Sequence, residues 1–190
     1  MKKIMMTLAA VCVAATMNAQ VWVGGELGFS SSHTNGNDNS TKAFSITPEI
    51  GYNLDENFAV AIKLGYDYQE DFDFGEFIGL NGLTSLRTNA YTVNPYVRYT
   101  FLKAGNFSAF VDGGIHYTTM HAQGVDDNFN QFGVNVTPGI SYAISEKVGL
   151  VAHLGKGLYW DHSWVKDTVR MNKFGLSLAI AISFGAYYNF

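Results

Sequence analysis

The chain has 190 residues, with 12 Lys or Arg against 16 Asp or Glu and a net charge of −4 when histidine is neutral. This acidic balance argues against nucleic acid as a partner. Aromatic residues make up 15% of the chain and 20 glycines accompany only three prolines, which is typical of an all-β protein. No low-complexity tract or linker divides the sequence, so we expect one domain.

The first residues predict a secretory signal peptide over residues 1–19. Lys2 and Lys3 form a basic start, residues 4–15 form a mostly apolar run, and Ala19 is a small residue at the expected cleavage site. The apolar run is too short for a membrane anchor. Residues 20–190 are therefore the expected mature domain, and it has no disulfide because Cys12 is the only cysteine of the chain.

Three segments repeat one pattern, in which a proline is followed at alternate positions by Ile or Val and then by Tyr. They are residues 47–54, 94–101 and 137–144, and their prolines lie 47 and then 43 residues apart. This spacing fits two strands and two connections per repeat. Since proline removes a hydrogen bond from a sheet, we expect a β-bulge at each one.

Each repeat is followed by a tight polar turn, and longer polar connections lie between the turns, at about residues 33–42, 69–89, 119–131 and 159–172. Four long and three short connections define eight strands. Short turns at one end and long loops at the other are typical of bacterial outer-membrane barrels, whose smallest members have eight strands. The expected strands are residues 21–31, 43–53, 58–68, 90–101, 107–118, 132–143, 148–155 and 173–190.

Each expected strand alternates between an apolar face and a face rich in small and polar residues, which is the period of a β-strand. The apolar face carries no charge, and aromatic residues gather at both strand ends, as the two girdles of a membrane barrel require. Lys156 does not fit this pattern, because continued alternation places its charge on the lipid face. We expect Gly155 and Gly157 to permit a shift of register there.

The last strand, residues 173–190, has no charge after Lys173 and approaches the roughly 20 residues of a transmembrane helix. A strand is favoured because the small residues all fall on one side only with a period of two. Its aromatic ending resembles the last strand of Gram-negative outer-membrane β-barrels, in which such an ending forms part of the assembly signal. The resemblance assigns that signal to Phe184, Tyr188 and Phe190.

Charges on the polar face can neutralise one another within hairpins, since Arg98 falls opposite Asp112 and Glu49 lies diagonal to Lys63. The interior of eight strands is only just wide enough for side chains to fill it. We therefore expect a plugged lumen without a sizeable pore. The expected structural charge network comprises Glu26, Glu49, Lys63, Arg98, Asp112 and His116.

The run Asp161-His162-Ser163 contains the three residue types of a hydrolase triad. A triad is assembled from separated positions, so three neighbours cannot easily face one another in the required order. We favour an ordinary polar loop here. The histidines have neither metal-binding spacing nor cysteine companions, and we expect no catalytic, cofactor-binding or metal-binding residue.

Residues 20–190 resemble the small porin-like outer-membrane β-barrels of the OmpA-membrane-domain and OmpX type, through the signal segment, the proline repeats and the ending 184–190. The resemblance implies an all-β, eight-stranded antiparallel up-and-down transmembrane β-barrel in the outer membrane, with both termini in the periplasm. It also implies a monomer that is not an enzyme, with a structural or adhesin-like surface role.

The expected partners are outer-membrane lipid and lipopolysaccharide, the barrel-assembly machinery, and an extracellular partner reached by the long loops 69–89 and 159–172. Two alternatives remain open. One is an outer-membrane lipid-modifying enzyme that uses Ser163. The other is a soluble secreted ligand-binding barrel, whose apolar face would turn inward.

Overall fold

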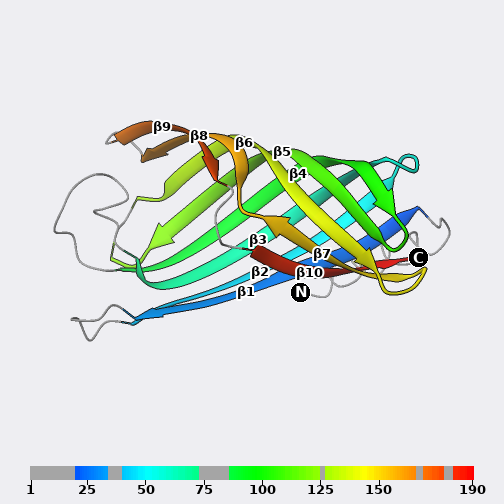
Figure 1. The fold of residues 1–190 in the computed structure, drawn as a ribbon. Helices are drawn as coiled ribbons and strands as arrows, with labels where there is room; N and C mark the ends of the chain where they lie inside the picture. The colour runs from blue at the N-terminus through cyan, green and yellow to red at the C-terminus, as the bar shows by residue number, and fades with distance from the viewer. Residues whose placement is uncertain (1–19, 34–39, 73–85, 125–126, 166–168, 178–181) are drawn as a thin grey trace, which may run out of the picture.

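A computed structural model describes residues 20–33, 40–72, 86–124, 127–165, 169–177 and 182–190 (Figure 1). The expected signal peptide, residues 1–19, lies outside the described residues. The described chain is all-β. Its strands are β1 Val21–His33, β2 Ser40–Asn53, β3 Phe58–Phe72, β4 Leu86–Ala104, β5 Phe107–Ala122, β6 Phe129–Ala143, β7 Val148–Leu154, β8 Gly157–Val165, β9 Val169–Ser177 and β10 Ile182–Asn189.

These strands form one closed antiparallel barrel. From β1 to β6 each strand pairs with the next, and β6 then pairs with β7 along one half of its length and with β8 along the other. β7 and β8 thus serve as the two halves of a seventh barrel strand, and β10 and β9, which pair with them, as the halves of an eighth. Pairing of β10 with β1, from Trp22 opposite Asn189 to Leu27 opposite Phe184, closes the barrel. The predicted eight-stranded fold is confirmed.

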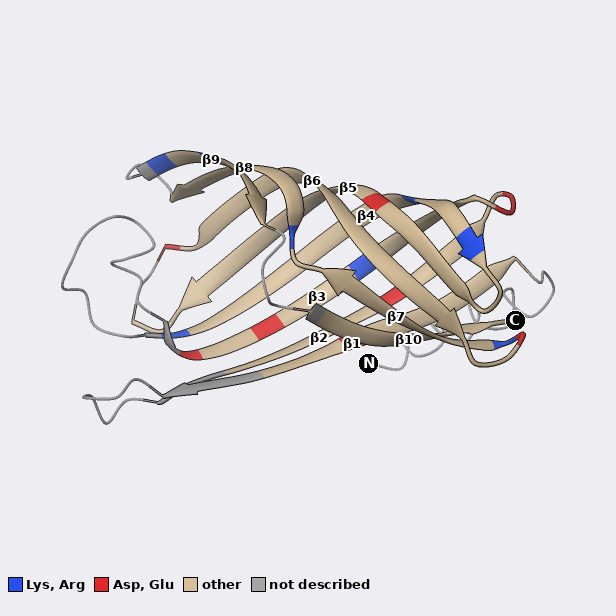
Figure 2. Ribbon diagram, in the orientation of Figure 1, with Lys and Arg blue, Asp and Glu red and all other residues tan. Residues whose placement is uncertain are grey.

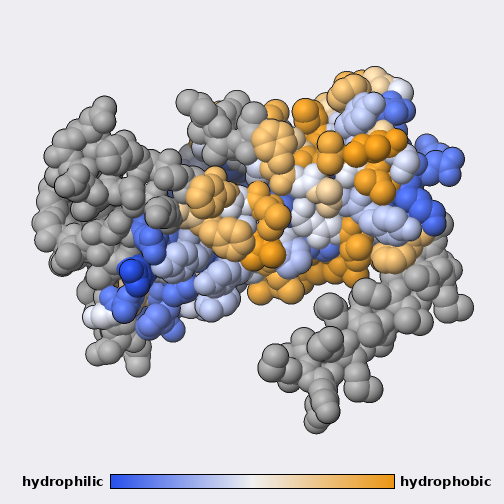
Figure 3. Space-filling model, turned by 90° about the horizontal axis from the view of Figure 1, so that it is seen from below, coloured by the Kyte–Doolittle hydropathy of each residue, from blue (hydrophilic) through white to orange (hydrophobic). Residues whose placement is uncertain are grey.

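The apolar positions of the strands face outward. Phe29, Phe174 and Phe184 are 78%, 75% and 67% exposed, whereas the inward rings of Trp22 and Phe110 are 4% and 1% exposed. Figure 3 shows the outward residues as a hydrophobic band across the barrel wall, with hydrophilic residues toward both ends. A soluble ligand-binding barrel needs these residues inside, so that alternative is wrong.

The helical alternative for residues 173–190 is also wrong, since residues 173–177 belong to β9 and residues 182–189 to β10. Within the described part of the chain, no helix is long and apolar enough to cross a membrane.

The tight turns lie where the sequence predicts them, but the strands run further toward the long loops. β3 extends to Phe72 and β4 begins at Leu86. The loop expected at residues 159–172 is wrong, because β8 and β9 occupy most of it. Asp161 and Ser163 there face the barrel interior and are both 3% exposed, so their polarity does not mark a loop.

The bulges expected at the first two prolines are wrong. Pairing between β2 and β3 has the same register before and after Pro48, and pairing between β4 and β5 has the same register before and after Pro95. In each case the proline itself has no partner on that neighbouring strand. The missing N–H is thus accommodated by a gap in pairing. At Pro138 the expectation is nearer the structure, because the register between β6 and its partners changes just there.

That change comes from a kink between β7 and β8. Gly155 and Gly157 both have φ of 67°, a left-handed backbone conformation that residues other than glycine rarely adopt. The pairing partner on β6 shifts by two residues across the kink, from Gly139 opposite His153 to Val136 opposite Leu158. Bulges of this kind redirect side chains. Lys156 accordingly turns inward, where it contacts Asp161 in the lumen.

Candidate functional site

The lumen holds a charged cluster, named here the central cluster, made of Glu26, Glu49, Lys63, Arg98, Asp112 and His153. Its strongest pair is bidentate: Arg98 Nε lies 2.8 Å from Asp112 Oδ1 and Arg98 Nη2 lies 2.8 Å from Asp112 Oδ2. The two residues are opposite each other on β4 and β5. Planar, doubly hydrogen-bonded pairs of this kind are among the strongest polar contacts in proteins.

Aromatic rings surround the guanidinium of Arg98. Its Cζ atom lies 3.9 Å from the ring centroid of Phe110, 5.5 Å from that of Trp22 and 5.6 Å from that of Tyr96. A cation over the face of an aromatic ring is attracted by the ring quadrupole, more strongly where water is excluded. Arg98 is therefore fixed by a carboxylate and by the rings around it.

Lys63 joins the other two carboxylates of the central cluster. Its Nζ lies 2.9 Å from Glu26 Oε1 and 3.7 Å from Glu49 Oε2, and the Tyr96 hydroxyl donates a 2.7 Å hydrogen bond to Glu49 Oε2. Glu49 and Lys63 are direct cross-strand partners rather than diagonal neighbours. Figure 2 shows charges of both signs midway along the strands, where an outer-membrane barrel would cross lipid.

His153 links the two parts of this cluster, although it was not among the residues expected in the charge network. Its Nε2 lies 2.9 Å from Asp112 Oδ2, and its Nδ1 lies 3.0 Å from Glu26 Oε1. Three carboxylates face only two permanent cations, Lys63 and Arg98. A protonated His153 would supply the third positive charge and balance the cluster.

A second group, the kink cluster, consists of His116, Lys156 and Asp161. Lys156 Nζ lies 2.5 Å from Asp161 Oδ2 and 4.3 Å from the centroid of the Tyr159 ring, while His116 Nε2 lies 3.0 Å from Asp161 Oδ1. His116 was expected in the first network but lies nearer the loop end. His116 reaches Asp161 across Gly133. A Cβ added at that glycine would lie 2.4 Å from Asp161 Oδ1, so a larger residue there would disturb the contact.

The Asp161-His162-Ser163 run is not assembled as a triad. Asp161 and Ser163 are buried in the lumen. His162 projects to the opposite, outer face of β8, where its Nδ1 lies 2.8 Å from Asn172 Oδ1. Strand alternation therefore separates the histidine from the other two side chains, and nothing in this geometry favours the lipid-modifying alternative.

Inward aromatic rings lie over glycines on neighbouring strands. A Cβ at any of these glycines would come within 2.2 to 2.4 Å of the facing ring, closer than real contacts allow. Each glycine is the direct cross-strand partner of its aromatic residue, so small and large residues alternate around the narrow interior. The pairs are Trp22 over Gly51, Phe110 over Gly139 and Tyr187 over Gly149.

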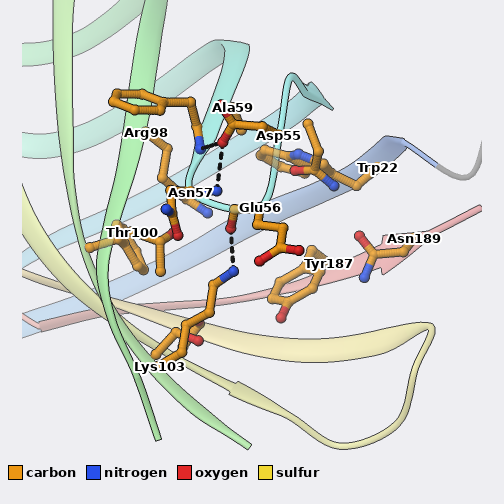
Figure 4. Close-up of a pocket in the computed structure, with 15 residues that line it drawn as sticks. Trp22, Asp55, Glu56, Asn57, Ala59, Arg98, Thr100, Lys103, Tyr187 and Asn189 are labelled. Atoms are coloured by element: carbon orange, nitrogen blue, oxygen red, sulfur yellow. Dashed lines mark hydrogen bonds between the residues drawn. The ribbon is translucent and has the colours of Figure 1, made fainter.

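These rings and the central cluster lie between two sets of cavities. The turn-end cavity, of about 190 Å³, is lined by Trp22, Arg98, Phe110, Tyr187 and other residues (Figure 4). The loop-end cavities, of about 440 and 280 Å³, adjoin each other and share Lys156 among their lining residues. No described residue lines both the turn-end and a loop-end cavity.

The mouth of the turn-end cavity is formed by the β2–β3 turn. Asp55 Oδ1 accepts hydrogen bonds from the backbone N–H groups of Asn57, at 2.7 Å, and Phe58, at 2.8 Å, and these bonds hold the pKa of Asp55 below its usual value. Lys103 donates to the Glu56 carbonyl across the mouth, as Figure 4 shows. The turn is thus held in one conformation next to the cavity.

The aromatic ending lies on the outer wall at the turn end. Phe184 and Tyr188 project outward from β10, and the Phe190 ring packs edge-on against Tyr188 with centroids 5.3 Å apart. The Phe190 N–H donates a hydrogen bond to the Val21 carbonyl, next to the β1–β10 seam.

Solved structures similar to this chain include three bacterial proteins. The structure of Neisserial surface protein A is similar to this chain, with a TM-score of 0.56, 17% identity, and coverage of 90% of this chain and 97% of that one. The N-terminal β-barrel domain of Pseudomonas aeruginosa OprF has a TM-score of 0.48 at 14% identity, covering 90% and 98%. A major outer membrane protein of Thermus thermophilus has a TM-score of 0.44 at 14% identity, covering 90% and 99%.

A comparison with curated proteins gives no match. The sequence profile of the outer membrane protein beta-barrel domain matches residues 4–188, nearly the whole chain. The chain therefore belongs to the outer membrane protein beta-barrel family, and its location is the outer membrane.

Proposed function

We propose that this protein is an integral outer-membrane barrel with a plugged lumen and a structural or adhesin-like surface role. The observation that carries the plugged lumen is the layer formed by Trp22, Tyr96, Arg98, Phe110 and Asp112. Arg98 contacts all four of the others, from strands β1, β4 and β5. The turn-end and loop-end cavities lie on opposite sides of this layer.

Opening a path through the layer would require Arg98 to leave Asp112 and the Phe110 ring together. Both side chains of the ion pair are largely buried, at 12% and 6% exposure. Separating such a pair leaves charges in a poorly solvated interior, which costs about 3–5 kcal/mol. A wide, permanently open pore is therefore not expected.

The proposed orientation places both termini in the periplasm. β1 begins and β10 ends beside each other, at the end of the barrel that carries the tight turns (Figure 1). In outer-membrane barrels short turns face the periplasm and longer loops face outward. The connection between β3 and β4, within the expected loop 69–89, would then carry any surface interaction, together with the short connection between β8 and β9 that remains of the expected loop 159–172.

Assembly is part of the same proposal. Phe184, Tyr188 and Phe190 line the last strand, which must pair with β1 to close the barrel. We propose that the barrel-assembly machinery recognises this ending and that the mature barrel is a monomer. Deleting Phe190 should reduce insertion into the outer membrane, while the amount of secreted precursor stays the same.

The decisive experiment is outer-membrane fractionation in sarkosyl with gel analysis of boiled and unboiled samples. We expect the chain in the sarkosyl-resistant fraction, with a mobility that changes on boiling. Recovery in the soluble periplasmic fraction without a mobility shift would contradict the proposal. Protease added to whole cells should cut only long-loop sites, and cleavage at the tight turns would reverse the orientation.

A further inference from the structure

The outer face of β8 carries a ladder of stacked rings near the loop end. Trp160 and His162 have centroids 6.3 Å apart with ring planes 19° apart, and His162 and Trp164 are 5.6 Å and 30° apart. Tyr117 on β5 adds a ring 6.3 Å from Trp164. An aromatic girdle needs rings at this height but does not need them stacked along one strand.

The ladder lies where the wall turns from apolar to polar. Cross-strand pairs arrange β6, β8 and β9 into rows that share one face. The row nearer the middle of the barrel is Val134, Trp160 and Phe174, and the row nearest the loops is Asn130, Trp164 and Arg170.

Hydrogen bonds hold the neighbours of the ladder in place. His162 Nδ1 lies 2.8 Å from Asn172 Oδ1, and the Tyr117 hydroxyl donates a 2.9 Å bond to Asn130 Oδ1. The rings are thus held before a ligand arrives, which lowers the entropic cost of binding.

The charge of this surface differs from that of the opposite wall. Arg170 is exposed beside Trp164, and in the part of the chain that the structure describes no carboxylate pairs with it. Arg87 on β4 is also exposed near the loop end, but there the Tyr68 hydroxyl lies near both Arg87 and the carboxylate of Glu70 on β3, to which it donates a hydrogen bond. Among the described residues, the β8–β9 wall therefore offers a cation without a carboxylate partner beside half-buried rings.

We propose that this surface binds the phosphorylated sugar headgroup of lipopolysaccharide. Arg170 pairs with a headgroup phosphate, the rings of His162 and Trp164 lie against the sugar, and Trp160 and Phe174 contact the first acyl carbons. Guanidinium groups match phosphate oxygens in geometry and charge. The inference rests on the proposed orientation, which places this end of the barrel in the outer leaflet.

Tryptophan fluorescence tests the site in the folded, detergent-solubilised barrel. The chain has three tryptophans, and Trp22 is buried in the lumen, so a change on adding lipopolysaccharide reports on β8. The titrants are lipopolysaccharide and the same material after removal of its lipid A phosphates. We expect Arg170→Gln to weaken binding of the phosphorylated form about fivefold, the contribution of one basic residue at an anionic lipid surface.

Arg87→Gln is the matched control and should bind both forms as the wild type does. Trp164→Ala, followed through Trp160, should weaken both forms, because the ring contacts sugar rather than phosphate. Equal wild-type affinity for the two forms, an unchanged Arg170→Gln, or an equal loss in Arg87→Gln would overturn the inference. A boiling-dependent mobility shift checks folding in every sample, so loss of the barrel itself is distinguished from loss of this site.

Discussion

The central cluster and the kink cluster show two ways in which one barrel places charge in its lumen. The central cluster uses ordinary alternation on strands of regular register, and its Arg98 and Asp112 are held from several sides. The kink cluster depends on Gly155 and Gly157, which turn a lysine inward, and the Lys156 side chain is 43% exposed. The first arrangement contributes Arg98 and Asp112 to the layer proposed to plug the lumen, whereas the second lies on the loop-end side of that layer and borders the cavities there.

Removing one member of the buried pair should have the largest effect. Arg98→Ala leaves Asp112 without its main partner in a poorly solvated layer, and we expect a loss of about 3–5 kcal/mol in the free energy of unfolding. Urea unfolding of the barrel in lipid vesicles measures it. Lys103→Ala, at the exposed turn end, is the control and should cost less than about 1 kcal/mol. Equal losses would contradict the central role of Arg98.

The kink can be tested through its backbone. Gly157→Ala places a Cβ 2.0 Å from the Val136 carbonyl oxygen in a residue whose φ is 67°, and we expect a loss of about 3 kcal/mol. Gly105→Ala is the matched control, because φ is 59° there and nothing lies within 4 Å. It should lose only about 1 kcal/mol. Equal effects at the two positions would mean that the contact with Val136 does not constrain the kink.

Overpacking should distinguish the layer around Arg98 from the outer wall. Gly51→Ala brings a Cβ within 2.2 Å of the Trp22 ring, so we expect a loss of about 2 kcal/mol in unfolding free energy. Gly113→Ala meets nothing within 4 Å on the outer face and should be nearly neutral. A neutral Gly51→Ala would indicate that the Trp22 ring can move aside and that the layer is loosely packed.

The smallest effect is expected at the exposed cation of the kink cluster. Lys156→Gln should cost less than about 1 kcal/mol, because water partly solvates the pair and His116 still contacts Asp161. Combined with Arg98→Ala, its effect should add within about 0.5 kcal/mol, since the clusters share no residue. A larger coupling energy would show that the two clusters act as one network.

Much of the barrel could be predicted because alternation and turn chemistry are local properties of the sequence. Turns after Asn53 and Ala143 follow from their polar residues, and the outward face from period-two apolar positions. The strand ends near the loops could not be predicted in the same way. Asp161 and Ser163 are polar because they face the lumen, so polarity there resembled a loop although the residues form β8.

Pairing across one hairpin could also be predicted from the sequence, as Arg98 opposite Asp112 illustrates. Contacts across the lumen could not be predicted, because they depend on barrel closure and on the kink. His153 lies on β7 yet contacts Glu26 on β1 and Asp112 on β5, and Lys156 is redirected only by two positive φ angles. A run of Gly-Lys-Gly in an otherwise alternating strand is the signal that indicated such a kink.

Planar-bilayer conductance tests the central claim, that the layer around Arg98 plugs the lumen. Wild-type barrel, inserted at known density, should give no large or stable channels, and Arg98→Ala should give more frequent openings. Large, stable channels from the wild-type barrel would contradict the claim.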